Sequence, residues 1–173
     1  MIISKKPPYQ GTTADAETTR MKINKLLRDY GVSGTQWTED YKLNKVELSF
    51  MVEAEINGQK KDIGIKIIPP LFAAKRRSWN PKRGHNEIIY SPNYAASYRL
   101  LFWYLKSKLE AIAYGLTTVE QEFLSQVVVA LPNGQQTTIG KALEESVSKG
   151  QLALEAKVVE RENPVIEVDE SAP

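Results

Sequence analysis

The sequence contains no cysteine and a single histidine, His85. Without cysteine, a disulfide framework, a thiolate metal site and a thiol nucleophile are excluded, and one histidine cannot form a multi-histidine zinc site. The glycine-rich phosphate-binding patterns G-x-x-x-x-G-K-[ST] and G-x-G-x-x-G are also absent, so no motif supports nucleotide hydrolysis. No stretch approaches the roughly 20 apolar residues of a membrane span. We therefore expect a protein that is not an enzyme, needs no cofactor and does not enter a membrane.

The N-terminal sequence MIISKKPPYQGTT does not have the pattern of a signal peptide. Its apolar run covers only residues 1–3, and the lysines follow this run instead of preceding it. Since the lack of cysteine also removes any need for an oxidising compartment, we expect a cytoplasmic location.

The chain of 173 residues is the size of one ordinary domain, with 42% hydrophobic and 25% charged residues. We divide it into an extended N-terminal segment (residues 1–14), a single α+β domain (15–150) and an acidic C-terminal tail (151–173) that we expect to be disordered.

Charge is distributed unevenly along the chain, although the formal net charge is only +2. Residues 1–59 are neutral, residues 60–110 carry 11 basic and 3 acidic side chains, and residues 111–173 carry 4 basic and 10 acidic ones. A strongly basic middle segment followed by an acidic end points to a polyanionic partner.

The alternation of residues predicts an antiparallel sheet of about three strands. In 46–56 every even-numbered residue is apolar or small, and the odd-numbered ones are mostly polar, which is typical of a strand with one buried face. Asn57-Gly58 predicts a hairpin turn into a second strand over 59–68. A third strand is expected over 35–41, and another over 151–159.

Helices are predicted on both sides of these strands in the sequence. The first begins at Thr13 or Asp15 as N-cap and ends at Gly31. A long helix follows Ser91-Pro92 and runs from about residue 93 to 114. Two further helices are expected. Thr117 and Glu120 form a capping box at the start of the first, and Thr138 caps the second. The order of elements predicts an α+β fold: an antiparallel meander of about three strands with helices packed on one face.

One basic segment containing a tryptophan provides the main functional signal. We interpret residues 71–91 as a long connection, and such connections are often functional. Cations hold phosphates and flat rings stack on unpaired bases, so the segment predicts a site for single-stranded DNA or RNA. Trp79 either stacks on a base or is buried in the core. The predicted site comprises Lys75, Arg76, Arg77, Trp79, Lys82, Arg83, Tyr90 and Arg99, with Lys60, Lys61, Lys66, Lys106 and Lys108 as extensions of the patch.

Other residues leave alternatives open. Glu53 and Glu55 share a strand face, where they form either a wet surface or a metal site for a nuclease. Trp37 and Tyr41 lie either in the core or on an open sheet face that stacks bases. Trp103 belongs either to the core or to the interface of a homo-oligomer.

Several segments together resemble a known group of proteins. The helix ends in LLRDYG, a strand ends in IPP, and YRLLFWYLKSKLEAIAYGL is followed by TTIGKAL. Over roughly residues 14–150 this pattern resembles uncharacterised small proteins of phages and mobile elements. The layout is also similar, at the level of the fold, to thermophile single-stranded DNA-binding families that lack an OB-fold. Neither resemblance implies a role for any particular residue.

The sequence therefore predicts a non-enzymatic accessory protein that binds single-stranded nucleic acid. The alternative is a protein-interaction or assembly module, in which the basic segment meets an acidic protein. The acidic tail either competes for the basic patch or recruits a protein partner.

Overall fold

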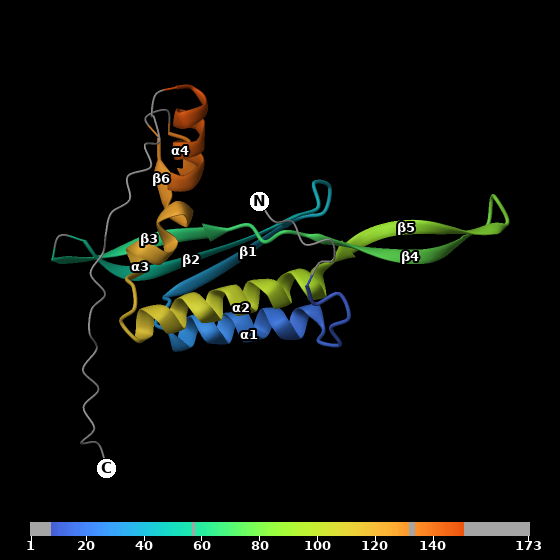
Figure 1. Cartoon of the computed structure of the whole chain (residues 1–173), viewed down its shortest axis with the longest axis horizontal. Coiled ribbons are helices and arrows are strands. Elements are labelled where there is room, and N and C mark those ends of the chain that lie inside the picture. The colour runs from blue at the N-terminus through green and yellow to red at the C-terminus, as the bar shows by residue number, and fades with distance from the viewer. Residues whose placement is uncertain (1–7, 57, 132–133, 151–173) are drawn as a thin grey trace, which may run out of the picture.

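The computed structural model describes residues 8–56, 58–131 and 134–150, and gives no side-chain placement for Glu55 and Ile56 (Figure 1). The predicted α+β class is confirmed. The elements in chain order are α1 (Ala16–Asp29), β1 (Gly34–Asp40), β2 (Lys45–Ile56), β3 (Gln59–Ile67), β4 (Phe72–Asn80), β5 (His85–Asn93), α2 (Tyr94–Ala113), α3 (Val119–Phe123), the 3-10 turn η1 (Leu124–Gln126), β6 (Val128–Ala130), β7 (Gln136–Thr138) and α4 (Ile139–Ser148).

The three predicted strands form one antiparallel sheet in the order β1-β2-β3. Phe50 on β2 lies opposite Thr35 on β1 and Ile65 on β3. The even-numbered face of β2 is buried from Val46 to Ala54, whereas Glu53 is exposed, as the alternation predicts. In the turn after β2, Gly58 has a positive φ of 72°, which glycine adopts without steric cost. Asn57 lies outside the described residues.

The core lies between this sheet and the helices α1 and α2, which run side by side along one face of it (Figure 1). Of the two predicted caps, Asp15 begins α1, because its carboxylate accepts hydrogen bonds from the backbone of Glu17 and Thr18. Phe123, at the end of α3, closes the core with its ring edge-on to that of Phe50, 5.8 Å between centroids. The other fully buried core side chains include Ile23, Leu27, Leu48, Ile65 and Leu105.

Trp37 packs against the core-facing helices. Its ring lies 5.2 Å from that of Tyr98, and its Nε1 donates a hydrogen bond to Asn24 Oδ1 at 2.9 Å. Tyr98 in turn donates to Glu39 Oε1 at 3.2 Å; burial, with the nearby Glu39 charge, raises the pKa of Tyr98. Of the two positions predicted for Trp37, the structure therefore supports the one in the core. Tyr41, in the turn after β1, is 72% exposed.

The largest difference from the sequence-based prediction concerns residues 71–91. They form a second antiparallel hairpin, β4–β5, whose pairing runs from Phe72 opposite Asn93 to Asn80 opposite His85. The prediction of an unstructured connection is wrong because cations occupy positions on both faces and hide the alternation typical of a strand. Pro92 is accommodated in β5 because a two-stranded hairpin has only edge strands.

Two predicted helix starts are also corrected. Ser91 and Pro92 belong to β5, and Asn93 is the N-cap of α2, accepting a hydrogen bond from Ala96 N at 3.1 Å. The capping box of α3 uses Thr118 and Gln121, one residue later than predicted, because Thr118 has the extended backbone of an N-cap. Sequence spacing alone allowed both registers, since each threonine is followed three residues later by Glu or Gln.

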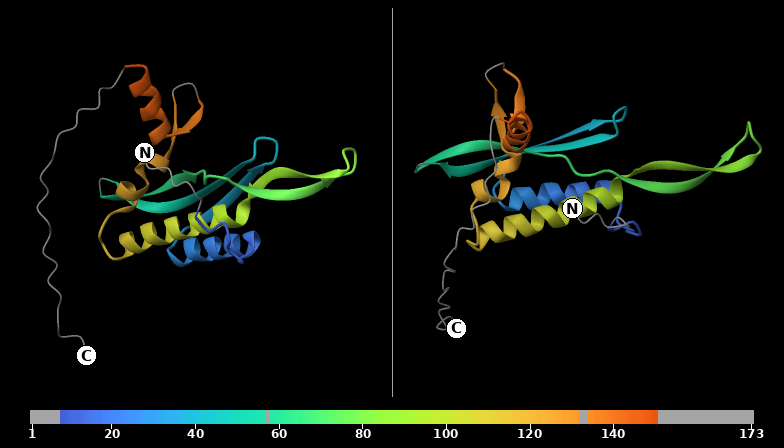
Figure 2. Two further views of the ribbon diagram at one scale, coloured as in Figure 1. Left: turned by 45° about the vertical axis from the view of Figure 1, so that its right-hand side comes forward. Right: turned by 45° about the horizontal axis from the view of Figure 1, so that its top comes forward.

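The elements β6, β7 and α4 project from the side of the sheet opposite to α1 and α2, so the predicted packing of helices on one face holds for α1 and α2 but not for α4 (Figures 1 and 2). Ile65 of β3 forms an isolated bridge with Val127 just before β6. Thr138 caps α4 and Gly150, with φ 67°, follows it, which confirms both predicted ends. The strand predicted over 151–159, the predicted tail and residues 1–7 lie outside the described residues.

Gly140 fixes the position of α4, and its replacement by alanine tests that packing. An added Cβ would lie 2.8 Å from Ser125 O, so Gly140→Ala must displace α4 from η1. Replacement of a helical glycine by alanine normally stabilises a protein by about 0.5–1 kcal/mol. Here we expect the packing of α4 against η1 to be destabilised by about 1–3 kcal/mol.

Hydrogen exchange of the α4 amides is the measurement, and exchange should accelerate in the Gly140→Ala variant. Gly34→Ala is the control, because an added Cβ at Gly34 meets nothing within 4 Å. Equal protection of α4 in both variants would contradict this packing.

Candidate nucleic-acid interface

The β4–β5 hairpin extends away from the sheet and helices as a two-stranded ribbon (Figures 1 and 2). Its strands have nine residues each, so the ribbon is about 30 Å long. At its base, the backbone N–H of Phe72 donates a hydrogen bond to Ser97 Oγ at 3.1 Å, which ties β4 to α2. Beyond this base, most side chains of the ribbon are exposed.

The register of the hairpin sorts the predicted site residues onto two faces. Cross-strand partners share a face and successive residues alternate, so one face carries the pairs Lys75 with Tyr90, Arg77 with Ile88, and Trp79 with Asn86. We call this the aromatic face; no acidic residue lies on it between Ala73 and Trp79 or among their partners. Trp79 is 60% exposed and Tyr90 is 70% exposed, so Trp79 is not a core residue.

The opposite face of the hairpin has a different character. It carries Arg76 beside Ile89, followed toward the turn by Ser78 with Glu87 and by Asn80 with His85. Glu87 forms an ion pair with Arg83 at 3.0 Å, and His85 Nε2 lies 3.6 Å from the same carboxylate. Sequence reasoning treated Arg76 and Arg77 as one cluster, but the strand directs them to opposite faces.

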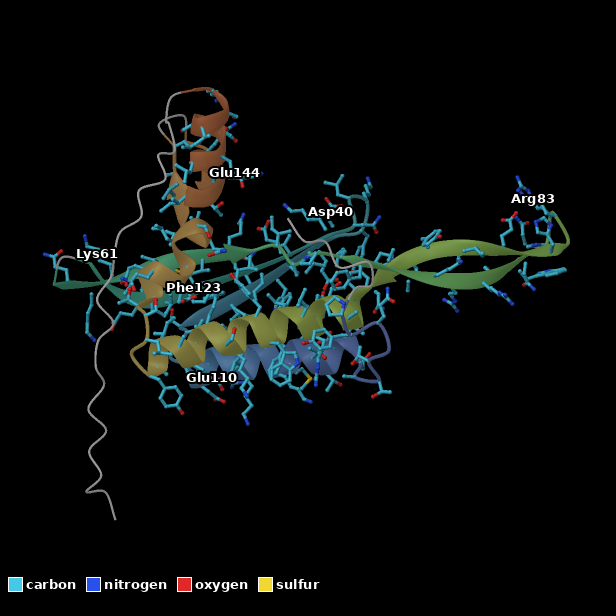
Figure 3. All side chains as sticks on the ribbon, in the orientation of Figure 1. Asp40, Lys61, Arg83, Glu110, Phe123 and Glu144 are labelled. Atoms are coloured by element: carbon cyan, nitrogen blue, oxygen red, sulfur yellow. The ribbon has the colours of Figure 1, made fainter. Side chains whose placement is uncertain are left out.

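The turn at the free end of the hairpin, residues 80–84, is held by Asn80. Its Oδ1 accepts a hydrogen bond from Lys82 N at 3.0 Å, and its carbonyl oxygen accepts from Arg83 N and Gly84 N at 3.2 and 2.9 Å. Its Nδ2 donates to Glu87 Oε2 at 2.9 Å. Figure 3 shows Arg83 at this far end of the molecule. The turn is therefore ordered by its own hydrogen bonds, without help from the body of the protein.

Four cations of the hairpin have no acidic partner among the residues that the structure describes. They are Lys75, Arg76, Arg77 and Lys82, and all four are exposed. Of the five lysines expected to extend the patch, four form an ion pair, whereas Lys61 has no acidic partner among the described residues. These pairs are Lys60 with Glu53, Lys66 with Glu47, Lys106 with Glu110, and Lys108 with Glu122. The hairpin thus carries four cations without an acidic partner, although other cations of the described chain, such as Lys22, Lys25 and Arg28 on α1, also have none.

Arg99 does not belong to the hairpin surface. It lies on α2, with its guanidinium 5.5 Å from the ring of Trp103, and Lys106 approaches the same ring at 5.4 Å. Trp103 is 40% exposed and contacts Phe102 edge-on. Arg99 and Trp103 form a separate surface on α2.

Of the two carboxylates considered for metal binding, the structure places the side chain of Glu53 alone. Glu53 is held by Lys60 at 2.7 Å, and the side chain of Glu55 lies outside the described ones. Among residues 8–56, 58–131 and 134–150, no three His, Asp or Glu side chains are grouped so that they could hold a metal ion.

A cleft of about 620 Å³, which the sequence did not predict, lies between β3, α2 and the β7–α4 unit. Lys45, Lys66 and Lys141 line it together with Glu47 and an apolar wall that includes Pro69 and Pro70. Burial opposes ionisation of Glu47, but hydrogen bonds from Lys66 and Lys45 outweigh it and lower the pKa of that carboxyl. Lys45 and Lys66 thus share one carboxylate, and Lys141 has no acidic partner among the described residues, so the cleft keeps a net positive charge.

Two further findings bear on function. No helix within the described part of the chain is both long and apolar enough to cross a membrane. Comparison of this chain with models of protein families, with curated proteins and with solved structures found no match in any of the three.

Proposed function

We propose that this protein is a non-enzymatic, single-strand-binding nucleic-acid protein that uses the aromatic face of the β4–β5 hairpin. The observation that supports this is the register of the hairpin, which aligns Lys75, Arg77 and Trp79 along one exposed face and adds Tyr90 from the other strand. Cations and flat rings on one surface are the combination that holds a phosphate backbone while its bases stack.

The unpaired cations supply the electrostatic part of the proposal. Lys75 and Arg77 are two positions apart on one strand, so they lie about 7 Å from each other along the ribbon. Neither has an acidic partner among the described residues, and both are free to contact phosphates. Contact with phosphates releases counterions, so the affinity should depend strongly on salt.

The exposed aromatic side chains favour unpaired bases. A two-stranded ribbon can enter the major groove of a duplex, so the backbone shape alone does not select single strands. Large exposed rings favour single strands, since the bases inside a duplex are stacked on both faces, whereas those of a single strand can leave the stack and offer a π-face. Trp79 and Tyr90 both have more than half of their surface available. The aromatic face therefore supports single-stranded DNA or RNA as the ligand.

A second candidate function is a protein-interaction or assembly module. It is favoured by the exposed apolar residues of α2 and the turn after it, where Trp103, Tyr114 and Leu116 are 40%, 82% and 72% exposed. This surface differs from that of the hairpin because its cations, Arg99 and Lys106, lie over the ring of Trp103. Failure to bind any polyanion would favour this function.

The two adjacent arginines of β4 provide a matched pair of variants. Arg77→Ala removes a cation from the aromatic face, and Arg76→Ala removes one from the opposite face. We expect Arg77→Ala to weaken binding to a fluorescent single-stranded oligonucleotide by about fivefold, close to 1 kcal/mol, because an exposed charge pair contributes roughly that much. Arg76→Ala should have a clearly smaller effect in the same anisotropy titration. Equal losses in both variants would mean that the hairpin acts only as a diffuse charge.

Trp79 and the salt dependence separate stacking from charge neutralisation. If Lys75, Arg77 and Lys82 each neutralise one phosphate, the slope of log K against log salt should be about −2. Arg77→Ala should flatten this slope by about 0.7. Trp79→Ala should cost about 1–3 kcal/mol while leaving the slope unchanged, since stacking releases no counterions.

Circular dichroism is the control for folding in these variants. Trp79 is 60% exposed, so removal of its ring should leave the thermal transition in place. Affinity that does not change with salt, or a Trp79→Ala variant that binds as well as the unaltered protein, would contradict the proposed function.

A further inference from the structure

The turn at the end of the hairpin adds a second kind of contact to the aromatic face. Pro81 and Lys82 are exposed at this turn, and the ring of Pro81 fixes its own φ. The hydrogen bonds to Asn80 hold the turn in one conformation. Since Arg83 is paired with Glu87, Lys82 is the cation of residues 80–84 that has no acidic partner within the described chain. The turn therefore presents the exposed ring of Pro81 beside one positive charge without an acidic partner.

Trp79 lies close to this end. It is two residues before Pro81, so its ring is within roughly 7 Å of the turn along the ribbon. In a continuous duplex every base pair is covered by its neighbours on both faces. Only the last pair, where a duplex meets a single strand, leaves a π-face open for a ring placed at the end of a narrow ribbon. Apolar side chains such as proline also act as wedges against base steps in known DNA-binding proteins.

The rest of the aromatic face is placed to receive the strand that leaves such a duplex. Behind Trp79 lie Arg77 and then Lys75, and Tyr90 is opposite Lys75. Trp79 lies four positions along β4 from the Lys75–Tyr90 pair, which corresponds to about 14 Å. A stacked strand advances about 3.4 Å per nucleotide, so about four nucleotides would pass between the two rings.

We propose, on the basis of the proposed function, that the hairpin recognises the junction between single- and double-stranded nucleic acid. The unpaired strand lies along the aromatic face from Trp79 to Tyr90. The turn with Pro81 and Lys82 contacts the end of the duplex.

The experiment compares four fluorescent DNAs by anisotropy at one salt concentration, using the full chain. They are a single strand, a blunt duplex, and the same duplex with either a 5′ or a 3′ single-stranded tail. We expect one tailed duplex to bind about tenfold more tightly than the single strand or the blunt duplex, because it engages both surfaces. Its affinity should increase with tail length up to about four or five nucleotides and then level off.

The chain offers a closely matched control for the turn. Lys82→Ala removes the available cation, and Lys42→Ala removes an exposed lysine from the β1–β2 turn. Both lysines follow an Asn or Asp whose side-chain oxygen accepts their backbone N–H, Asn80 at 3.0 Å and Asp40 at 2.9 Å. Lys82→Ala, and Pro81→Ala separately, should weaken binding to the tailed duplex more than binding to the single strand, so the preference for the tailed duplex falls. Lys42→Ala should alter neither.

The possible results distinguish the two proposals. Equal binding to the single strand and to both tailed duplexes, with no effect of the turn variants, overturns junction recognition and leaves the proposed function standing. A blunt duplex that binds as tightly as the tailed ones also overturns it, in favour of a groove contact. If none of the four DNAs binds, and matched RNAs do not bind either, the proposed function fails together with this inference.

Discussion

The period-two alternation of side chains along paired strands is the constraint on which both halves of this structure depend. In β2 it brings the even-numbered residues together beneath α1 and α2, where Phe50 meets Phe123. In β4 the same alternation separates Arg76 from Arg77 and aligns Lys75 with Trp79. One geometric rule thus builds a core where the residues are apolar, and an exposed two-faced surface where they are charged and aromatic.

The sequence predicts the core well because the buried elements carry redundant signals. The strand over β2 has strict alternation, Asp15 and Thr138 supply caps, and Gly31 and Gly150 mark helix ends. The hairpin lacks such redundancy. Its burial against the body is slight, so no apolar periodicity marks it. The residues Asn80, Pro81 and Gly84 are typical of a turn, but no hairpin was predicted from them. An isolated hairpin is marginally stable, which also makes it hard to recognise from local preference.

The sequence predicted which residues belong to the candidate site, but not how they are arranged in space. The predicted site residues lie together on one hairpin, apart from Arg99, which packs over Trp103 on α2. Helix and strand positions that lie 20 residues apart in the sequence cannot be placed relative to each other without the tertiary structure. The neutralisation of Lys66 by Glu47 and of Lys108 by Glu122 could not be predicted for the same reason.

The pairing of the hairpin makes its function unequally sensitive to different kinds of genetic change. A substitution at one position alters one side chain and leaves the others in place. Loss of a single codon within β4 would shift every later residue by one position, and Trp79 would then point to the face now occupied by Arg76. Substitutions should therefore accumulate in this hairpin more readily than insertions or deletions of one residue. Insertions or deletions of two residues would keep each side chain on its original face.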